Sequence, residues 1–525
     1  MDSANHGIQE GAATARAAEF GDRIDMFLRS QRTLIIAAIC GYAFLRILIF
    51  SAAFPLFNPL DEQDHFETVE RYAHGYVPGS ELPQTGPEMA RLFAVYSSPE
   101  YLISRQRLRA VGMDVPVTQM PVELKDSQYQ KRFGYWSMER DTEAQSPPVY
   151  YIVAGGWYKL GAMLGAKDWV LAYWVRFLNA GVYVFFVWIS FLFVERVYPD
   201  RDFLGVGIPA FLAVFPQDVF FGINRDILSP LLVALALLLL FDAMREGVSS
   251  YFDLIAGAFL VGIAFLTDVS NCVLFGALAV ALCVVVKRAV RKGAVQKEFA
   301  MILAAAIAAV VPPALWVARN RLVIGDLTGL KAKIAYLGWT VKPWSEMWQH
   351  PIFSLHGSAY FLQELIKKYW RGESLWEGRA MQWSVADGFY VISSFLLLAA
   401  FATYLAKWST PENRLSRISG RVSLYLFVAS VLFLATISLP FDFHRCFYPS
   451  HELPYFVSGR IICGTLLPFA LIYLSGFEYL WRPVRSYVHP VIPLAVFLIF
   501  VTCSEMLIRR DVFHSAFNFF SLLGN

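Results

Sequence analysis

Four titratable residues stand together directly after the first long apolar run of the chain: Asp61, Glu62, Asp64 and His65. Asp61, Asp64 and His65 are spaced i, i+3 and i+4, so a helix would place them on one side. A carboxylate at the edge of a membrane is partly desolvated, which raises its pKa and makes it a stronger base. The stretch predicts a general-base site. The alternative is structural, with Asp61 as the N-cap of the helix and its acidic neighbours favoured by the helix dipole.

Several arginines on the same predicted side of the membrane could stabilise a leaving group that gains negative charge, because a guanidinium binds oxyanions bidentately. The candidates are Arg225, Arg319, Arg321, Arg445 and Arg460. Arg319 and Arg460 stand at the ends of apolar runs, where an arginine can also simply extend toward lipid head groups. Arg225 and Asp226 could equally form a local ion pair.

Other groups carry weaker signals. The lysines Lys331 and Lys333 are interpreted as solvated, and the tryptophans of the same region as residents of the bilayer interface. His444 and His451 lack the spacing of metal ligands. The acids could bind a divalent metal ion through oxygen atoms, and that question stays open.

The composition identifies the environment in which these groups act. Of 525 residues, 57% are hydrophobic and 17% charged, and the mean hydropathy is +0.47. A soluble or disordered chain does not have this composition, so we expect a multi-pass membrane protein. The net charge of +3 gives no reason to expect nucleic acid as a partner. The six cysteines are scattered, which indicates neither a disulfide framework nor a zinc site.

Apolar runs predict an all-α polytopic bundle of about 11 transmembrane helices, since a span needs roughly 20 residues. They cover 33–54, 169–194, 203–222, 227–244, 251–267, 271–287, 299–317, 387–406, 421–440, 460–480 and 488–508. The first follows a polar tail and is expected to be an uncleaved signal anchor.

Lysine and arginine in the short loops set the orientation. The rich side, predicted to be cytoplasmic, carries Arg196, Arg201, Arg245, Lys287, Arg288, Arg291, Lys292, Lys297, Lys407, Arg414, Arg417, Arg421, Arg482 and Arg485. The short loops of the other side hold only Arg225 and Arg445. Counting spans from a cytoplasmic N-terminus works only if 148–165 does not cross. That Gly-rich segment, which begins with two prolines, is predicted to be a re-entrant or surface-lying helix on the outer side, with a short span as the alternative.

Two large outer loops result, over about 55–168 and 318–386, and both are expected to contain juxtamembrane helices. We therefore divide the chain into a cytoplasmic tail (1–32, with 1–25 expected to be disordered), a transmembrane module (33–317), the second outer loop (318–386) and the C-terminal helices (387–525).

Short motifs in this frame resemble the GT-C superfamily of integral-membrane glycosyltransferases, including protein O-mannosyltransferases and lipid A aminoarabinose transferases. They are the outer Asp61-Glu62 pair, Ser146-Pro147-Pro148-Val149-Tyr150-Tyr151, Arg176-Phe177-Leu178-Asn179, Asn224-Arg225-Asp226, Arg319-Asn320 with Gly325-Asp326, and Ser458-Gly459-Arg460. Ser146 and Arg225 depart from the family pattern.

The resemblance implies an inverting transfer of a sugar from a polyprenyl-phosphate donor to an acceptor hydroxyl at the outer face of a membrane, here expected to be a bacterial inner membrane. Asp61 matches the family's catalytic Asp, and Glu62 its neighbour. The substrate-binding residues expected with them are His65, Tyr150, Arg225, Asp226, Arg319 and Arg460. The acceptor could be a glycan, a lipid or a protein.

Two other functions compete with this one. A transporter or flippase of a lipid-linked glycan could use the same acids, although transporters tend to show repeated halves, and we find no repeat. A scaffold protein would need no convergent acids and cations.

Overall fold

The computed structural model describes residues 21, 23–58, 61–245, 251–293, 295–407, 414–446 and 448–524. The predicted disordered tail 1–25 therefore lies almost entirely outside the described residues. Within them, nine helical stretches are long and apolar enough to cross a membrane, and two shorter apolar helices accompany them. The predicted fold class, a polytopic all-α membrane bundle, is confirmed.

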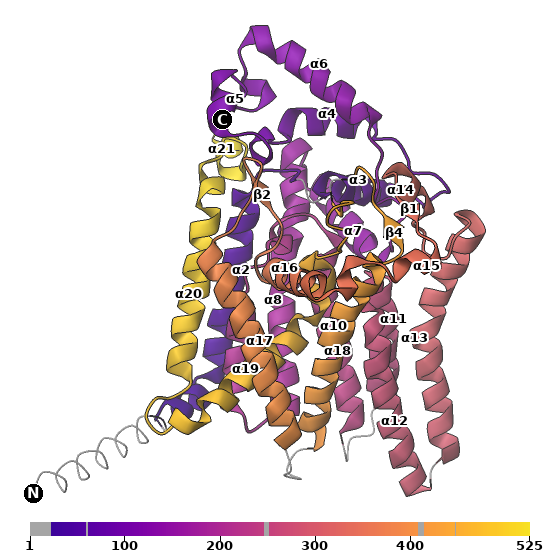
Figure 1. The fold of residues 1–525 in the computed structure, drawn as a ribbon, viewed down its shortest axis with the longest axis vertical. Helices are drawn as coiled ribbons and strands as arrows, with labels where there is room; N and C mark the ends of the chain where they lie inside the picture. Colours follow the sequence, from indigo (N-terminus) through magenta and orange to yellow (C-terminus); the bar gives the residue numbers. More distant parts are fainter. Residues whose placement is uncertain are drawn as a thin grey trace, which may run out of the picture.

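The long helices run roughly parallel, as Figure 1 shows. They are α2 (Arg32–Ala53), α8 (Asp168–Val197), α10 (Leu228–Met244), α12 (Leu274–Lys292), α13 (Val295–Val323), α17 (Ser384–Lys407), α18 (Arg414–Ser438), α19 (Leu466–Trp481) and α20 (Val491–Arg509), with the shorter α9 (Asp202–Ala213) and α11 (Tyr251–Phe265) among them. The first and the last of the described residues lie at opposite ends of the bundle (Figure 1).

One predicted span is corrected by the structure. Residues 203–222 do not form a continuous helix: α9 ends at Ala213, and a 3-10 helix, η3 (Asp218–Phe221), follows. Pro216 stands in the break, where a proline can neither donate a backbone hydrogen bond nor continue the helix. The irregular backbone is tolerated because it is buried in protein.

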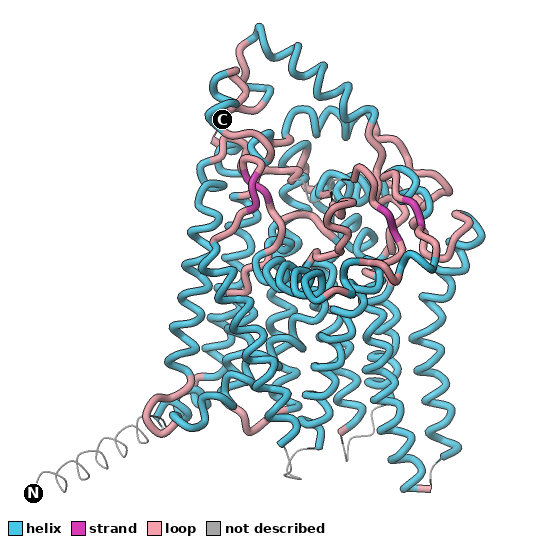
Figure 2. The backbone as a smooth tube through the Cα atoms, viewed as in Figure 1, coloured by secondary structure: helices cyan, strands magenta, loops and turns pink. Residues whose placement is uncertain are grey.

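The two long connections gather at one end, which we call the large-loop end (residues 61–167 and 324–383; Figure 2). They form α3 (Glu62–Ala73), α4 (Pro87–Tyr96), α5 (Arg105–Ala110), α6 (Val122–Met138), α7 (Val149–Met163), α14 (Lys331–Tyr336), α15 (Trp344–Met347) and α16 (Leu355–Arg371). Strands β1 (Thr340–Val341) and β4 (Phe441–Asp442) pair antiparallel, as do β2 (Leu375–Trp376) and β3 (Arg379–Ala380). The C-terminal helix α21 (Phe519–Leu523) lies at this end too.

Helix α7 covers the segment 148–165, whose crossing the sequence left open. Its 15 residues pack against α3 at the large-loop end, and a Cβ added at Gly155 would lie 3.1 Å from the backbone nitrogen of Ala73. The helix thus belongs to the large-loop end and not to the parallel bundle (Figure 1).

Helix α16 fixes a second element of the site. The Trp370 ring stacks on Tyr390 of α17 with centroids 4.6 Å apart, which anchors α16 in the bundle. The 3-10 helix η8 (Gly459–Thr465) crosses α16 so closely that a Cβ at Gly459 would lie 2.2 Å from the Tyr369 Cα. Only glycine permits this approach, and the next residue is Arg460.

Candidate active site

Asp61 stands between α2 and α3 in an unusual backbone conformation. Its φ is +63°, a left-handed value that Asp and Asn tolerate better than most residues. Asp61 occupies the N-cap position of α3, as the structural alternative expected, but its side chain makes no capping hydrogen bond. The carboxylate is 43% exposed, and its Oδ2 atom lies 3.1 Å from Nη2 of Arg460.

Glu62, one residue on, has different surroundings. It is 1% exposed and forms an ion pair with Arg176 of α8, whose Nη2 lies 2.6 Å from its Oε2. Glu62 also accepts hydrogen bonds from the backbone nitrogens of Asn58, at 3.1 Å, and Ile223, at 2.9 Å. Arg176 donates in turn to the carbonyl oxygens of Ser51 and Pro55 at the end of α2. The pair thus fastens the turn that presents Asp61.

A second carboxylate, Glu143, lies between two cations from distant segments. Its Oε2 is 2.9 Å from Nη1 of Arg225, in the 3-10 helix η4 (Arg225–Ile227), and its Oε1 is 2.5 Å from Nζ of Lys333 in α14. Burial alone would raise the pKa of Glu143, but Arg225 and Lys333 hold it well below its usual range. Burial would lower the pKa of Lys333, but Glu143 and Asp61 raise it. Both groups therefore stay charged.

Arg225 and Arg460 connect these groups to two further acids. Nε of Arg225 is 3.2 Å from Oδ2 of Asp268, and Nη1 of Arg460 is 3.6 Å from Oδ2 of Asp226. Nε of Arg460 is buried without a hydrogen-bond partner. We call these seven side chains the charged network: Asp61, Glu143, Arg225, Asp226, Asp268, Lys333 and Arg460.

Asp64 and His65 border the network. The partly buried Asp64 accepts a hydrogen bond of 2.5 Å from Thr142, and burial together with Asp61 raises its pKa to about 8. Burial lowers the pKa of His65 to about 3, so its ring is neutral. Nδ1 of His65 lies 2.8 Å from the Tyr151 hydroxyl, whereas its Nε2 is buried without a partner. Tyr150 is 1% exposed and packs edge-on against Tyr151.

The structure thus brings together Asp61, Arg225, Asp226 and Arg460 among the residues expected from the sequence, with His65 beside them. It does not bring Arg319 into the network: that guanidinium lies over the Trp316 ring at 5.2 Å and donates to Asn320. Arg321 donates to the carbonyl oxygen of Gly325. His444 and His451 lie elsewhere, beside Asp442 of β4.

Sequence reasoning missed Glu143 and assigned Lys333 to solvent. Glu143 stands three residues before Ser146, which donates to it, so the Pro147-Pro148 motif was the available signal. Lys333 offered none, because its contact spans 190 residues of sequence.

A divalent metal ion does not fit these residues. In the described part of the chain, no group of three or more His, Cys, Asp and Glu side chains could hold one. The network's carboxylates already face guanidinium or ammonium groups, so we derive no step through a metal.

Comparison with known proteins adds little to this picture. No protein-family model and no curated protein matches the chain. Among solved structures, the chain is similar to the crystal structure of ArnT from Cupriavidus metallidurans bound to undecaprenyl phosphate, with 14% sequence identity, 87% of this chain and 79% of that chain covered, and a TM-score of 0.32. A likeness of this size does not assign the chain to a family.

Proposed function

We propose that the protein is an inverting glycosyltransferase that moves a sugar from a polyprenyl-phosphate-linked donor to an acceptor hydroxyl at the large-loop end. The observation that carries the proposal is Asp61: a half-exposed carboxylate whose side chain makes no capping hydrogen bond, beside the partly buried Arg460, whose buried Nε has no partner. The class of donor comes from the motif resemblance. The distribution of lysine and arginine in the short loops supports an outer-face position for this end, in a membrane that we take to be a bacterial inner membrane.

Asp61 is the base in this proposal. A hydroxyl is a poor nucleophile at neutral pH, and a positioned carboxylate removes its proton as the new bond forms. The proton passes from the acceptor oxygen to the Asp61 carboxylate, the oxygen bonds to the anomeric carbon, and the bond from that carbon to the phosphate oxygen breaks. Glu62 is a poor candidate for the base, because its oxygens already accept hydrogen bonds from Arg176 and two backbone amides.

The cations serve the leaving group. The departing polyprenyl phosphate keeps the electron pair and changes from a phosphodiester monoanion to a monoester with one more negative charge. Arg460 can direct its unpartnered Nε toward the phosphate. Lys333 and Arg225 add positive charge, and their partial burial strengthens its attraction for the phosphate. Asp226, Asp268 and Glu143 hold these cations in place before substrate binds.

Asp64 is an internal control. With a pKa of about 8 its carboxyl is mostly protonated at neutral pH, so it is a poor candidate for the base. Neutral His65, with its free Nε2, can form a hydrogen bond to a sugar hydroxyl.

The experiment compares Asp61→Asn with Asp64→Asn. Asparagine keeps the shape of Asp61 and tolerates its left-handed backbone, but it cannot take a proton. We expect sugar transfer by the purified protein to fall about 10²- to 10⁴-fold in Asp61→Asn. The thermal denaturation midpoint should stay unchanged, and Asp64→Asn should cost much less activity.

Wild-type transfer by Asp61→Asn would remove Asp61 as the base. If the wild-type protein in vesicles moved a labelled lipid-linked sugar across the bilayer and never transferred it, the transporter alternative would be correct instead.

A further inference from the structure

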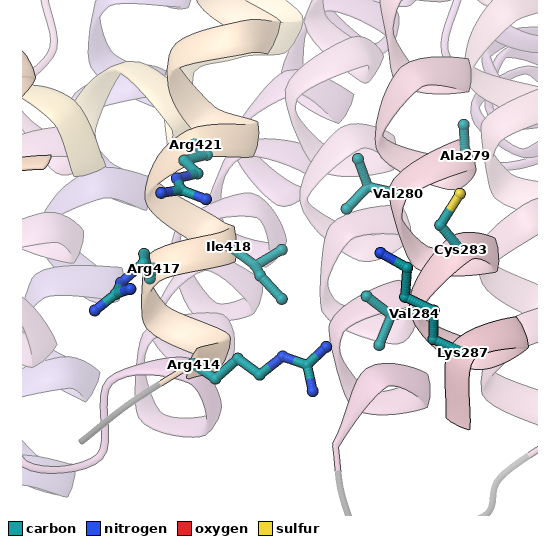
Figure 3. A pocket seen from close by; sticks show the side chains of 9 residues that line it. All are labelled: Ala279, Val280, Cys283, Val284, Lys287, Arg414, Arg417, Ile418 and Arg421. Carbon is teal, nitrogen blue, oxygen red and sulfur yellow. The ribbon is translucent and has the colours of Figure 1, made fainter. Parts of the chain in front are cut away.

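A groove between α12 and α18 lies at the end of the bundle opposite the charged network. It has a volume of about 710 Å³. Lys287 of α12 and Arg414, Arg417 and Arg421 of α18 line it, together with Cys283 and several aliphatic side chains (Figure 3). Four of the nine lining residues are cations.

The lining changes character along the groove. Arg414, Arg417 and Arg421 stand in the first turns of α18, and Lys287 lies toward the C-terminal end of α12. Figure 3 shows the Lys287 ammonium and the Arg414 guanidinium directed into the gap between the two helices. Farther along α12, toward the middle of the bundle, the lining is aliphatic. The α18 wall is therefore mostly basic along its length, with Arg421 level with Val280, whereas the α12 wall is basic only at Lys287 (Figure 3).

The groove adjoins an exposed apolar surface of α12. Val286 and Val290 of α12, beside Lys287, are 40% and 61% exposed. Both helices are candidate membrane spans. Basic pockets between transmembrane helices on the positively charged side suit anionic lipid head groups.

We propose that this groove binds an anionic phospholipid, with the phosphate held by Lys287, Arg414 and Arg421 and an acyl chain against the aliphatic side chains of α12. The occupant is not the sugar donor: the charged network lies at the other end of the bundle, so a donor held here could not present its sugar to Asp61 (Figure 1).

The first test measures lipid binding to the full-length protein by native mass spectrometry. Phosphatidylglycerol is compared with phosphatidylcholine of the same acyl chains. The wild type should retain one phosphatidylglycerol at activation energies that remove phosphatidylcholine. Lys287→Gln/Arg421→Gln should weaken binding about 30-fold, five- to sixfold for each charge. The control Lys407→Gln/Arg485→Gln removes two charges at the same end outside the groove and should change nothing. Equal retention of both lipids, or equal loss in both variants, contradicts the proposal.

The second test uses the wild-type protein alone, so it does not depend on whether a variant folds. Cys283 lines the groove, and Cys503, on α20, is an exposed thiol elsewhere. Phosphatidylglycerol should slow maleimide labelling of Cys283 and leave that of Cys503 unchanged. Equal protection of both thiols overturns the proposal. Protection by glycerol phosphate alone would show an anion site without a lipid, and stronger protection by polyprenyl phosphate would show a different occupant.

Discussion

In the last turns of α20 Glu505 lies between Arg46 and Arg509, and in the charged network Glu143 lies between Arg225 and Lys333. Both carboxylates are at most 3% exposed. The cations differ: Arg46 and Arg509 are 3% exposed, whereas Arg225 and Lys333 are 23% and 22% exposed. Solvent and ligands can therefore reach the second pair of cations and not the first.

The cluster of Arg46, Glu505 and Arg509 supplies hydrogen bonds to backbone carbonyl oxygens. Arg46 donates to the carbonyl oxygens of Ala213 and Phe215, and Arg509 to those of Pro216 and Arg371. The first three carbonyls belong to the break after α9, where a helix end leaves oxygens unpaired. The two arginines supply the donors that the irregular backbone lacks.

The cations of the charged network are not used in this way to pair backbone carbonyl oxygens. The network's contacts join side chains from six separate segments of the chain. Nε of Arg460 and, beside the network, Nε2 of His65 are buried without partners. The difference teaches that a buried arginine–carboxylate cluster is structural when its hydrogen bonds are used up within the protein. It is a candidate site when donors remain open toward a partly exposed acid.

The largest expected effect separates the two glutamates. Glu505→Gln leaves two buried arginines without a counter-charge and should lower the free energy of unfolding by about 3–5 kcal/mol. Glu143→Gln should cost less stability, because its cations can reach solvent, but should reduce transfer strongly. Thermal denaturation and transfer per folded molecule measure both effects. Asp168→Asn, which breaks the exposed Arg91–Asp168 pair, is the control and should cost at most about 1 kcal/mol. Equal loss of stability in the two glutamine variants would erase the distinction drawn here.

The next effect concerns Arg460. Arg460→Gln removes a charge-assisted contact to the proposed donor phosphate, worth roughly 1.5–3 kcal/mol, so kcat/KM for the donor should fall about 10- to 150-fold. Arg319 lies outside the network, so Arg319→Gln should lower kcat/KM for the donor much less. Comparable losses in the two variants would show that the network does not mark the phosphate site.

Most of the fold could be predicted from the sequence, because long apolar runs place spans and loop lysines and arginines orient them. The exception was 203–222, because hydropathy does not report backbone geometry. The run is apolar apart from Gln217 and Asp218, but α9 ends at Ala213, ahead of Pro216. The donors that make the break tolerable, Arg46 and Arg509, come from the first and last spans and could not be associated with it by sequence.

The site could be predicted from the sequence only where its residues stand in short local patterns. Asp61, Arg225, Asp226 and Arg460 stand at the ends of apolar runs, where a motif or a lone charge is visible. No sequence pattern predicted that the adjacent residues Asp61 and Glu62 have different partners. Asp61 pairs with Arg460, whereas Glu62 is buried and pairs with Arg176. Glu143 and Lys333 lie in long loops whose partners are set by folding alone.

The smallest predicted effect is a pH dependence of stability near the network. Burial and Asp61 raise the pKa of Asp64 to about 8, so the folded state holds this proton more tightly than the unfolded state does. Its contribution to stability is complete below the unfolded pKa near 4 and is lost as the pH rises toward 8. Burial lowers the pKa of His65 to about 3, and its contribution is complete above the unfolded pKa near 6.5 and is lost as the pH falls.

The two titrations oppose each other between about pH 4 and 6.5, and Asp64 acts without His65 between about pH 6.5 and 8. In that upper window the free energy of unfolding should fall as the pH rises, and Asp64→Asn should make the slope shallower by at most about 1.4 kcal/mol per pH unit. In the lower window the same variant should show stability rising more steeply with pH, because the His65 contribution is no longer offset. The pKa of Asp64 is also affected by its neighbours Asp61, Glu143, Lys333 and Thr142. The control for a general change in charge is Asp168→Asn, which alters an exposed acid at the same end. Denaturation curves at half-unit pH steps measure the slopes. Parallel curves for Asp64→Asn and the wild type would mean that Asp64 is ionised at neutral pH, and it would then become a second candidate for the base beside Asp61.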